Sequence, residues 1–435
     1  METRAGDPGA FAHFDLNRVD SPAFVIDAAK LRANLAILAD VRDRAGIKVL
    51  AALKAFSMWR VAPLIGDALD GVCTSGLWEA RLAREHYRGE IATYCAAYKA
   101  QDLPEICAIS DHVIFNSPGQ IARFRAALDT LTGFDIGLRI NPLHATGDVP
   151  RYDPCAPHSR LGFPVDQLQP GDLAGVSGLH FHTLCEQDFG PLQRTWEALR
   201  PHIAPYLSQL KWLNFGGGHH ITRADYQRDE LVDFLKAVKA ETALEIYLEP
   251  GEAVALDAGI LVGTILDTHW NGMPLAITDI SATCHMPDVI EAPYRPALLG
   301  ELPPKDAASS DPPPLGEVAA RSADGGGGAF GAPSVSPFGS ATSPDGGGIR
   351  ESRHGAVRLG GPSCLAGDVI GDYHLPAPVE PGQRFAFLDQ AHYSMVKTTS
   401  FNGVPLPSIW LWDSSDDVLE CVRRFGWETF RDRLS

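Results

Sequence analysis

Short apolar runs alternate with longer amphipathic segments between residues 48 and 251. Segments 77–85 and 119–128 place their apolar residues at the spacing of a helix that buries one face. Alternation of strand and helix implies parallel strands, and eight such units predict an α/β fold, a (β/α)8 barrel of the TIM type. The apolar runs that we expect to form the strands are 48–53, 71–74, 91–95, 112–115, 135–140, 176–182, 211–215 and 245–249.

The pattern changes after residue 257. Four later runs predict antiparallel strands joined by turns, and the region 11–25 is expected to join them. We therefore expect the barrel at 28–257 and a second, mainly antiparallel β-domain formed by 1–27 and 258–435. Inside the barrel, the long gap 141–175 predicts a loop over the barrel mouth followed by a short helix. The four later runs are 260–266, 275–280, 384–388 and 409–412.

Residues 301–353 differ in kind, because proline triplets and glycine runs alternate there with serine, alanine and aspartate. Such a segment buries too little apolar area to offset its ordering entropy, so we predict a disordered surface insertion. A regulatory role is one interpretation of it. An incidental, tolerated loop is the better one.

Charge and cysteine usage narrow the function classes. The 435-residue chain has a formal net charge of -17, which argues against nonspecific nucleic-acid binding and fits a cationic small-molecule substrate. No apolar run approaches the ~20 residues of a membrane span, and the first residues contain no signal-peptide core. The eight cysteines form no CxxC pair, so we expect reduced thiols in a cytoplasmic protein.

Residues able to do chemistry lie at the ends of several predicted barrel strands. In a barrel of this kind the carboxyl ends of the strands meet at one mouth, so we expect these side chains to converge on one site. Phosphate sites are also common beside the seventh and eighth strands. The residues are Lys54, Arg139, His182, Gly216, Gly217, Gly218 and Glu249.

This set offers what pyridoxal phosphate requires. Lys54 supplies an amine for an imine, and the imidazole of His182 supplies a flat surface for the ring. The glycines allow backbone N–H groups to approach a phosphate without a Cβ in the way. The anion of Glu249 would keep a pyridine nitrogen protonated, and a protonated ring is the electron sink that decarboxylation needs.

Each member has an ordinary explanation when it stands alone. A lysine after a strand is commonly a solvated strand end, a triple glycine a flexible turn, and a terminal glutamate a cap for the next turn. A histidine after an apolar strand is commonly a satisfied core residue, and His180 fits that description. His219 and His220 suggest a metal site, but no third ligand stands at a diagnostic spacing, so we predict none. The ordered set favours the cofactor.

Several motifs carry a family resemblance. They are Ala51-Ala-Leu-Lys54-Ala-Phe56, Leu179-His-Phe-His182, Phe215-Gly-Gly-Gly218, Glu249-Pro-Gly251, Gly361-Pro-Ser-Cys364 and Tyr393. Together they resemble the fold-type III pyridoxal-phosphate decarboxylases, which include the ornithine, arginine and diaminopimelate enzymes. The sequence is most similar to the carboxynorspermidine (carboxyspermidine) decarboxylase branch, on Leu184-Cys-Glu-Gln187, Glu249-Pro-Gly-Glu252, the segment 285–296 and Gly361–Asp368.

The resemblance implies a role for each matching position. Lys54 would hold the cofactor covalently, His182 would stack on its ring, and Glu249 would pair with the ring nitrogen. Gly216–Gly218 and Tyr393 would bind the phosphate, while Arg139 joins the cofactor-binding set. Cys364 would reprotonate the substrate carbon and would come from the partner subunit of a homodimer. Three carboxylates are expected to anchor the amines of a carboxylated polyamine: Asp288, Glu291 and Asp368.

Two departures and several alternatives remain. Thr183-Leu184-Cys185 and Glu252 replace a serine and an arginine that bind phosphate in other branches, so another phosphate contact is required. A diaminopimelate, ornithine or arginine decarboxylase is the nearest alternative. An amino-acid racemase would favour arginine in place of Glu249, and a noncatalytic cofactor-binding protein would need neither the second domain nor Cys364. Carboxynorspermidine and carboxyspermidine differ by one methylene, which a pocket discriminates by only ~1–3 kcal/mol.

Overall fold

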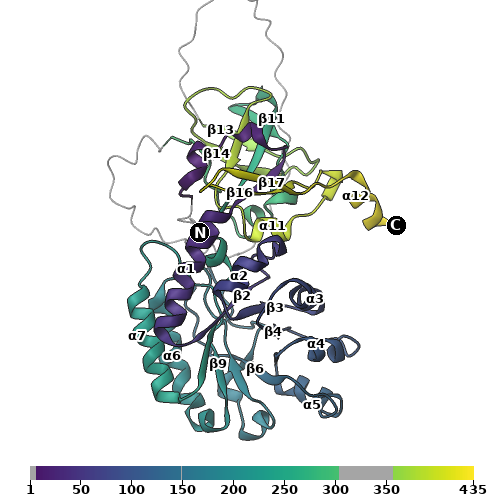
Figure 1. The fold of residues 1–435 in the computed structure, drawn as a ribbon. Helices are drawn as coiled ribbons and strands as arrows, with labels where there is room; N and C mark the ends of the chain where they lie inside the picture. Colours follow the sequence, from purple (N-terminus) through teal and green to yellow (C-terminus); the bar gives the residue numbers. More distant parts are fainter. Residues whose placement is uncertain (1–5, 148, 303–355) are drawn as a thin grey trace, which may run out of the picture.

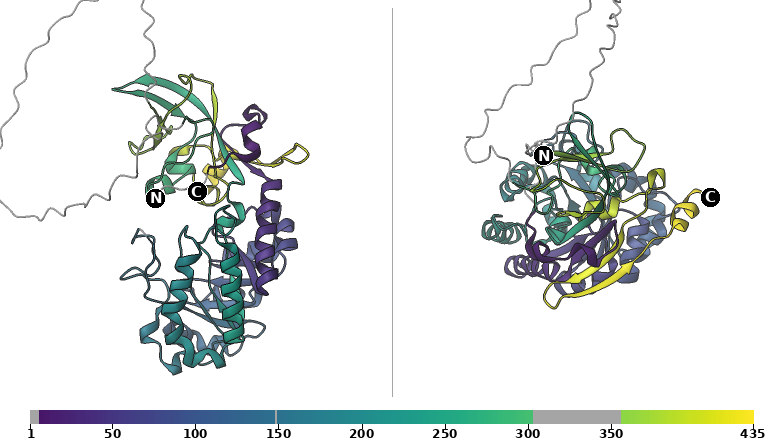
Figure 2. Two further views of the ribbon diagram at one scale, coloured as in Figure 1. Left: turned by 90° about the vertical axis from the view of Figure 1, so that its left-hand side faces the viewer. Right: turned by 90° about the horizontal axis from the view of Figure 1, so that it is seen from above.

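The computed structural model describes residues 6–147, 149–302 and 356–435. Two sheets organise this part of the chain. Figure 1 shows a helix-covered barrel below and a second sheet above it, and the left view of Figure 2 shows the same two layers from the side. The predicted insertion at 301–353 lies outside the described residues, apart from its first two positions.

Eight parallel strands close into the barrel, and each lies within two residues of its predicted run at both ends. Neighbouring strands pair in chain order, and the pairing of the last strand with the first closes the ring. The predicted (β/α)8 fold is therefore confirmed. The strands are β2 (Lys48–Ala52), β3 (Gly71–Thr74), β4 (Glu90–Tyr94), β5 (His112–Phe115), β6 (Asp135–Asn141), β8 (Gly178–His180), β9 (Trp212–Asn214) and β10 (Glu245–Leu248).

The barrel helices start and stop where the sequence provides caps. The Asp27 carboxylate accepts a hydrogen bond from the Ala29 amide at the start of α1, which ends at Gly46 with a φ of 64°. Ser117 caps α5, whose first residue is Pro118. The helices are α1 (Ala28–Ala45), α2 (Ala62–Ala68), α3 (Leu77–His86), α4 (Leu103–Ile109), α5 (Pro118–Leu128), α6 (Phe189–Ile203), α7 (Arg228–Thr242) and α8 (Glu252–Ala255).

The short helix expected within 141–175 takes the 3-10 form. That segment contains the two-residue strand β7 (Phe163–Pro164) and two 3-10 helices, η4 (Val165–Gln167) and η5 (Pro170–Leu173). These two helices are three and four residues long, and two residues separate them. Pro170 lacks an amide donor and would stand inside any α-helix that spanned both, so no such helix propagates there.

The second sheet is mainly antiparallel, as predicted. Only the β1–β16 and β12–β13 pairings are parallel among its pairs in the described residues. Its strands are β1 (Ala23–Asp27), β11 (Gly259–Trp270), β12 (Pro274–Thr278), β13 (Val357–Gly360), β14 (Val369–Tyr373), β15 (Arg384–Phe387), β16 (Ser408–Asp413) and β17 (Val418–Arg423). Four short helices accompany them, α9 (Ala282–His285), α10 (Asp288–Glu291), α11 (Tyr393–Lys397) and α12 (Trp427–Leu434).

One apolar core joins the two layers. Leu261 and Phe387 of the second sheet belong to the same buried cluster as Leu138 and Leu179 of the barrel. This packing fixes the loops of the second sheet over the barrel mouth. Since β1 ends at Asp27 and β11 begins only at Gly259, we propose to keep the division into a barrel at 28–257 and a β-domain formed by the flanking parts. No helix in the described ranges has the length and hydropathy to cross a bilayer.

Candidate active site

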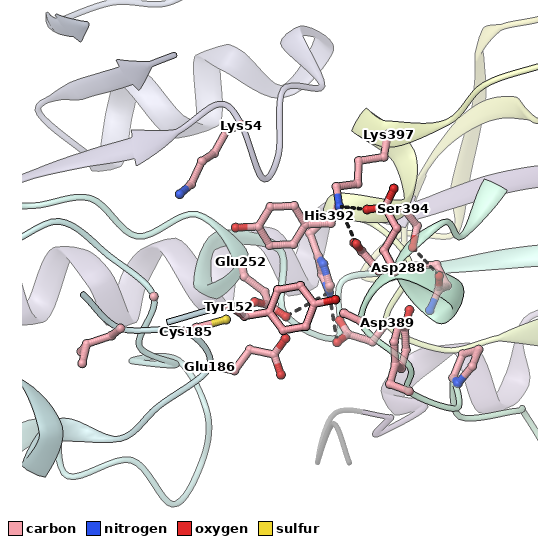
Figure 3. Close-up of a pocket in the computed structure, with 18 of the residues that line it drawn as sticks. Lys54, Tyr152, Cys185, Glu186, Glu252, Asp288, Asp389, His392, Ser394 and Lys397 are labelled. Carbon is pink, nitrogen blue, oxygen red and sulfur yellow. Dashed lines mark hydrogen bonds and ion pairs between the residues drawn. The ribbon is translucent and has the colours of Figure 1, made fainter. Parts of the chain in front are cut away.

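A cavity of about 340 Å³ opens at the carboxyl ends of the barrel strands. Its size lies within the usual range for sites that hold small molecules. The barrel contributes Lys54, Arg139, His182, Leu184, Cys185, Glu186, Gly218 and Glu252 to its walls. The β-domain contributes Asp288, Glu291, Tyr294, Asp389, His392, Tyr393 and Lys397. Figure 3 shows how side chains of both layers face this space.

Lys54 lies in the turn after β2, and its side chain is exposed to the open cavity. The amide of Gly217 donates to Nδ1 of His182 at 2.9 Å, so the ring hydrogen of a neutral His182 stands on Nε2. That nitrogen lies 3.2 Å from Lys54 Nζ, so in this tautomer its hydrogen faces the amine. Burial and the nearby Arg139 guanidinium lower the pKa of Lys54. The site thus lowers the cost of removing a proton from this amine.

The triple glycine is required by close backbone approach. A Cβ on Gly217 would lie 2.0 Å from the carbonyl oxygen of Glu249, and one on Gly218 would lie 2.0 Å from that of Leu184. Gly216 and Gly218 also have positive φ angles of 64° and 87°. The loop packs tightly between β8, β10 and the cavity. The amides of Gly216 and Gly217 are occupied by Asn214 and His182.

Glu249 lies just beyond β10 and is held by two barrel residues. Asn214 donates to one carboxylate oxygen at 2.7 Å, and Nε2 of His180 lies 3.1 Å from the other. Burial alone would raise the pKa of Glu249, but its interaction with His180 and the hydrogen bond from Asn214 outweigh burial, and the pKa is lowered. Burial lowers the pKa of His180, so we assign a neutral imidazole beside an ionised carboxylate. Glu249 lies near enough to Lys54 to influence its pKa, although its side chain does not line the cavity.

Arg139 and Tyr393 lie at opposite walls. Arg139 extends from β6, donates from Nη2 to the carbonyl oxygen of His182 at 2.9 Å, and lies 4.6 Å from the ring centre of Tyr94. It therefore supports the turn that carries His182. Tyr393 is the first residue of α11 and lines the cavity from the β-domain. The structure thus brings Lys54, Arg139, His182, Gly218 and Tyr393 to one space.

Three buried charged groups form a second cluster in the cavity wall that the sequence analysis did not identify. Nε2 of His392 lies 3.1 Å from Asp389 and 3.7 Å from Glu252. Burial opposes the charge on His392, but these two carboxylates raise its pKa to about 10. The sequence analysis noted Glu252 only as the residue that stands in place of an arginine. Its carboxylate also lies 3.3 Å from Nε2 of His220. The resulting charge pairing compensates the buried carboxylate.

The ligand atoms of Glu252, Asp389 and His392 lie within 4.8 Å of one another, a spacing that could suit a metal ion. A protonated imidazole has no free lone pair, so the raised pKa of His392 favours an ion-pair network. His219 does not belong to this cluster, and its Nδ1 lies 2.6 Å from the Tyr226 hydroxyl.

Asp288 and Glu291 line the cavity from α10, and both contact Lys397 of α11. Lys397 was not identified from the sequence. Lys397 is more than 100 residues from Asp288 and Glu291 along the sequence, so no local sequence pattern predicts the contact.

Cys364 and Asp368 lie away from the cavity within this chain. Cys364 is exposed in the loop between β13 and β14, where its amide donates to the side chain of Asn402 at 2.7 Å. Asp368 is buried and accepts hydrogen bonds from Ser281 at 2.8 Å and from the amide of Ser363 at 3.3 Å. It holds the loop that presents Cys364. Their assigned roles in a shared site stay predictions.

Comparisons with known proteins identify the family. The chain is 33% identical over 95% of its length to a carboxynorspermidine/carboxyspermidine decarboxylase from Campylobacter jejuni, of which it covers 98%. It is 35% identical to a carboxyaminopropylagmatine decarboxylase from Synechocystis, with 96% of each chain covered. A crystal structure of carboxynorspermidine decarboxylase from Campylobacter jejuni complexed with norspermidine matches with a TM-score of 0.78 and 33% identity, over 95% of this chain and 100% of that one.

No protein-family model matches the sequence. The near-complete coverage of these relatives nevertheless excludes a similarity confined to a common barrel. It confirms the predicted enzyme class, a decarboxylase, and the predicted branch. The protein belongs to the carboxynorspermidine/carboxyspermidine decarboxylase family.

Proposed function

We propose that the protein binds pyridoxal phosphate through Lys54 and decarboxylates carboxynorspermidine or carboxyspermidine to the triamine. The observation that carries this proposal is a single cavity lined by the Lys54 amine and by five acidic side chains. Carboxylates at this density suit a polycationic substrate. They are Glu186, Glu252, Asp288, Glu291 and Asp389.

The residues present fit the cofactor. Lys54 would supply the amine that binds its carbonyl carbon, and Gly218 lines the same cavity. Glu249, held ionised by Asn214 and His180, supplies the anion for the ring nitrogen. When bound, pyridoxal phosphate supplies the electron sink that takes up the bond electrons as carbon dioxide leaves. An arginine is absent beside the Glu249-Pro-Gly motif, so we propose that Tyr393 and the Gly218 amide take a larger share of the phosphate contacts.

Each side chain has a task in this scheme. His182 orients Lys54 by donating from Nε2, and Glu249 keeps its negative charge at neutral pH because its pKa is lowered. We propose that the Sγ of Cys364, reaching in from a partner subunit, returns a proton to the substrate carbon. The enzyme would then be a homodimer with shared sites. Mixing inactive Lys54→Ala and Cys364→Ala proteins would restore part of the activity only in such a dimer.

Carboxyaminopropylagmatine is a second candidate substrate. The relative of that name is 35% identical to this chain. Its substrate ends in a guanidinium group, whose planar fork suits paired carboxylates. All eight cysteines are free in the structure, and we propose a cytoplasmic location on that support.

Product analysis tests the proposal. Purified, cofactor-loaded protein is incubated separately with carboxynorspermidine, carboxyspermidine, carboxyaminopropylagmatine and diaminopimelate, with Lys54→Ala as the inactive control. We expect the corresponding triamine from one or both of the first two substrates. Turnover of diaminopimelate alone, or equal turnover by Lys54→Ala, would overturn the proposal.

A further inference from the structure

An ion pair inside the chain occupies the carboxylates of α10. Lys397 Nζ contacts Asp288 directly and lies 3.3 Å from an oxygen of Glu291. All three side chains line the cavity that holds Lys54. Figure 3 draws Lys397 and Asp288 on the opposite side of the site from Lys54, with His392 between them.

One lysine satisfies both carboxylates of α10. Asp288 and Glu291 are three residues apart on one helical turn, so their carboxylates face the same side. Lys397 is the last residue of α11 and reaches across to both. Its burial opposes the positive charge, yet the two carboxylates raise its pKa above the ordinary value, so the amine stays protonated. A second cation could pair with these carboxylates only by displacing or sharing them.

We propose that Lys397 is an internal counter-cation for Asp288 and Glu291, and that the distal ammonium of the polyamine substrate takes its place. Lys397 then acts as a specificity-determining residue, because it weakens the binding of any cation that cannot compete with it. It also repels a polycation that enters the cavity. This inference rests on the proposed function, since it names the part of the substrate that α10 recognises.

The ion pair is weak enough to be exchanged. The side chains of Lys397, Asp288 and Glu291 are 39%, 22% and 59% exposed, so solvent screens their attraction. Partly exposed pairs of this kind contribute little each, and two of them correspond to about a two- to tenfold change in affinity. An ammonium on a substrate anchored at Lys54 gains from proximity and can outcompete Lys397.

The test measures binding apart from turnover. Lys397→Met keeps the length and the apolar stem but removes the charge. Lys211→Met is the matched control, because Lys211 pairs with Asp135 at 2.7 Å at the amino end of the barrel strands, away from the cavity. Norspermidine binding to the cofactor-loaded proteins is measured by calorimetry, and KM and kcat are measured with the preferred carboxylated triamine.

We expect Lys397→Met to bind norspermidine two- to tenfold more tightly and to lower KM by a similar factor, with kcat within about twofold of wild type. Lys211→Met should match wild type in all three. Unchanged or weaker norspermidine binding by folded Lys397→Met would overturn the inference. A wild-type protein that binds norspermidine but decarboxylates no triamine acid would instead overturn the proposed function, and the binding comparison would still decide the role of Lys397.

Discussion

Replacing Gly217 with alanine is expected to push the loop after β9 away from the segment that follows β10. The new Cβ would lie 2.0 Å from the carbonyl oxygen of Glu249 and 2.9 Å from its carbonyl carbon. Ordinary contact begins near 3.4 Å, so two backbone segments must separate by more than 1 Å. Neither is a flexible side chain, and the strain cannot be relieved locally.

The cost follows from that displacement. Overpacking of a tightly packed site costs about 1–3 kcal/mol, and a backbone clash belongs at the upper end. For a domain the size of this barrel, about 3 kcal/mol lowers Tm by roughly 6–12 °C. The same shift stretches the 2.7 Å bond from the Glu249 amide to Gly216 and the 2.9 Å bond from the Gly217 amide to His182. Loss of one such bond would weaken cofactor binding by about tenfold.

Thermal unfolding followed by circular dichroism measures the stability, and titration with pyridoxal phosphate measures cofactor affinity. Gly171→Ala is the matched control, because this exposed glycine has no atom within 4 Å of the added Cβ. It should leave Tm unchanged or slightly raised. The reasoning is refuted if Gly217→Ala unfolds at the wild-type temperature and takes up the cofactor with wild-type affinity.

Three further predictions concern charge and proton transfer. Burial opposes the charge of Glu90, but hydrogen bonds from a histidine, a lysine and a tyrosine lower its pKa to about 2 from an ordinary 4.5. The stability that Glu90 contributes should therefore be complete above pH 4.5 and fall as pH drops toward 2. Glu90→Gln should lose on the order of 3 kcal/mol at pH 7 and flatten this part of the dependence, and a pH–Tm profile identical to wild type would contradict the prediction. Cys364→Ala should lower the rate of triamine formation by about 10²-fold or more without affecting cofactor uptake, and a wild-type rate would exclude Cys364 as the proton donor. Glu249→Gln should keep the fold but lower kcat far more than it raises KM, because it removes the anion held by His180 and Asn214; unchanged steady-state rates would show that this charge has no part in the reaction.

The barrel could be predicted because each of its strands is marked by a signal within a short stretch of the sequence. Runs such as 112–115 and 245–249 are apolar, short and bounded by turn residues, and β5 and β10 form there within two residues. The helix expected before β8 forms only as two short 3-10 helices, because Pro164 precedes the first and Pro170 begins the second. Strands β13, β14 and β17 were not predicted. Arg358 and Asp372 are paired across β13 and β14, so part of what defines those strands is a contact between exposed charges that neither run reveals alone.

The site could be predicted in part. Lys54 and His182 lie at strand ends, and the barrel topology brings strand ends together without further information. Asp389, His392 and Lys397 lie on loops and helix ends of the β-domain, and only long-range packing brings them to Glu252 and Asp288. Asp368 is the opposite case. Its place in a motif suggested a ligand contact, whereas within this chain it accepts hydrogen bonds from Ser281 and the loop around Cys364.

The most direct test of the central claim is to reduce the cofactor-loaded enzyme with borohydride and to map the labelled peptide by mass spectrometry. The account predicts a single modification at Lys54, because that amine lines the cavity beside His182 and its pKa is lowered. Lys54→Ala should take up no covalent label and form no triamine. Cofactor fixed to Lys397, or to any other lysine, with Lys54 unmodified in active enzyme would contradict it.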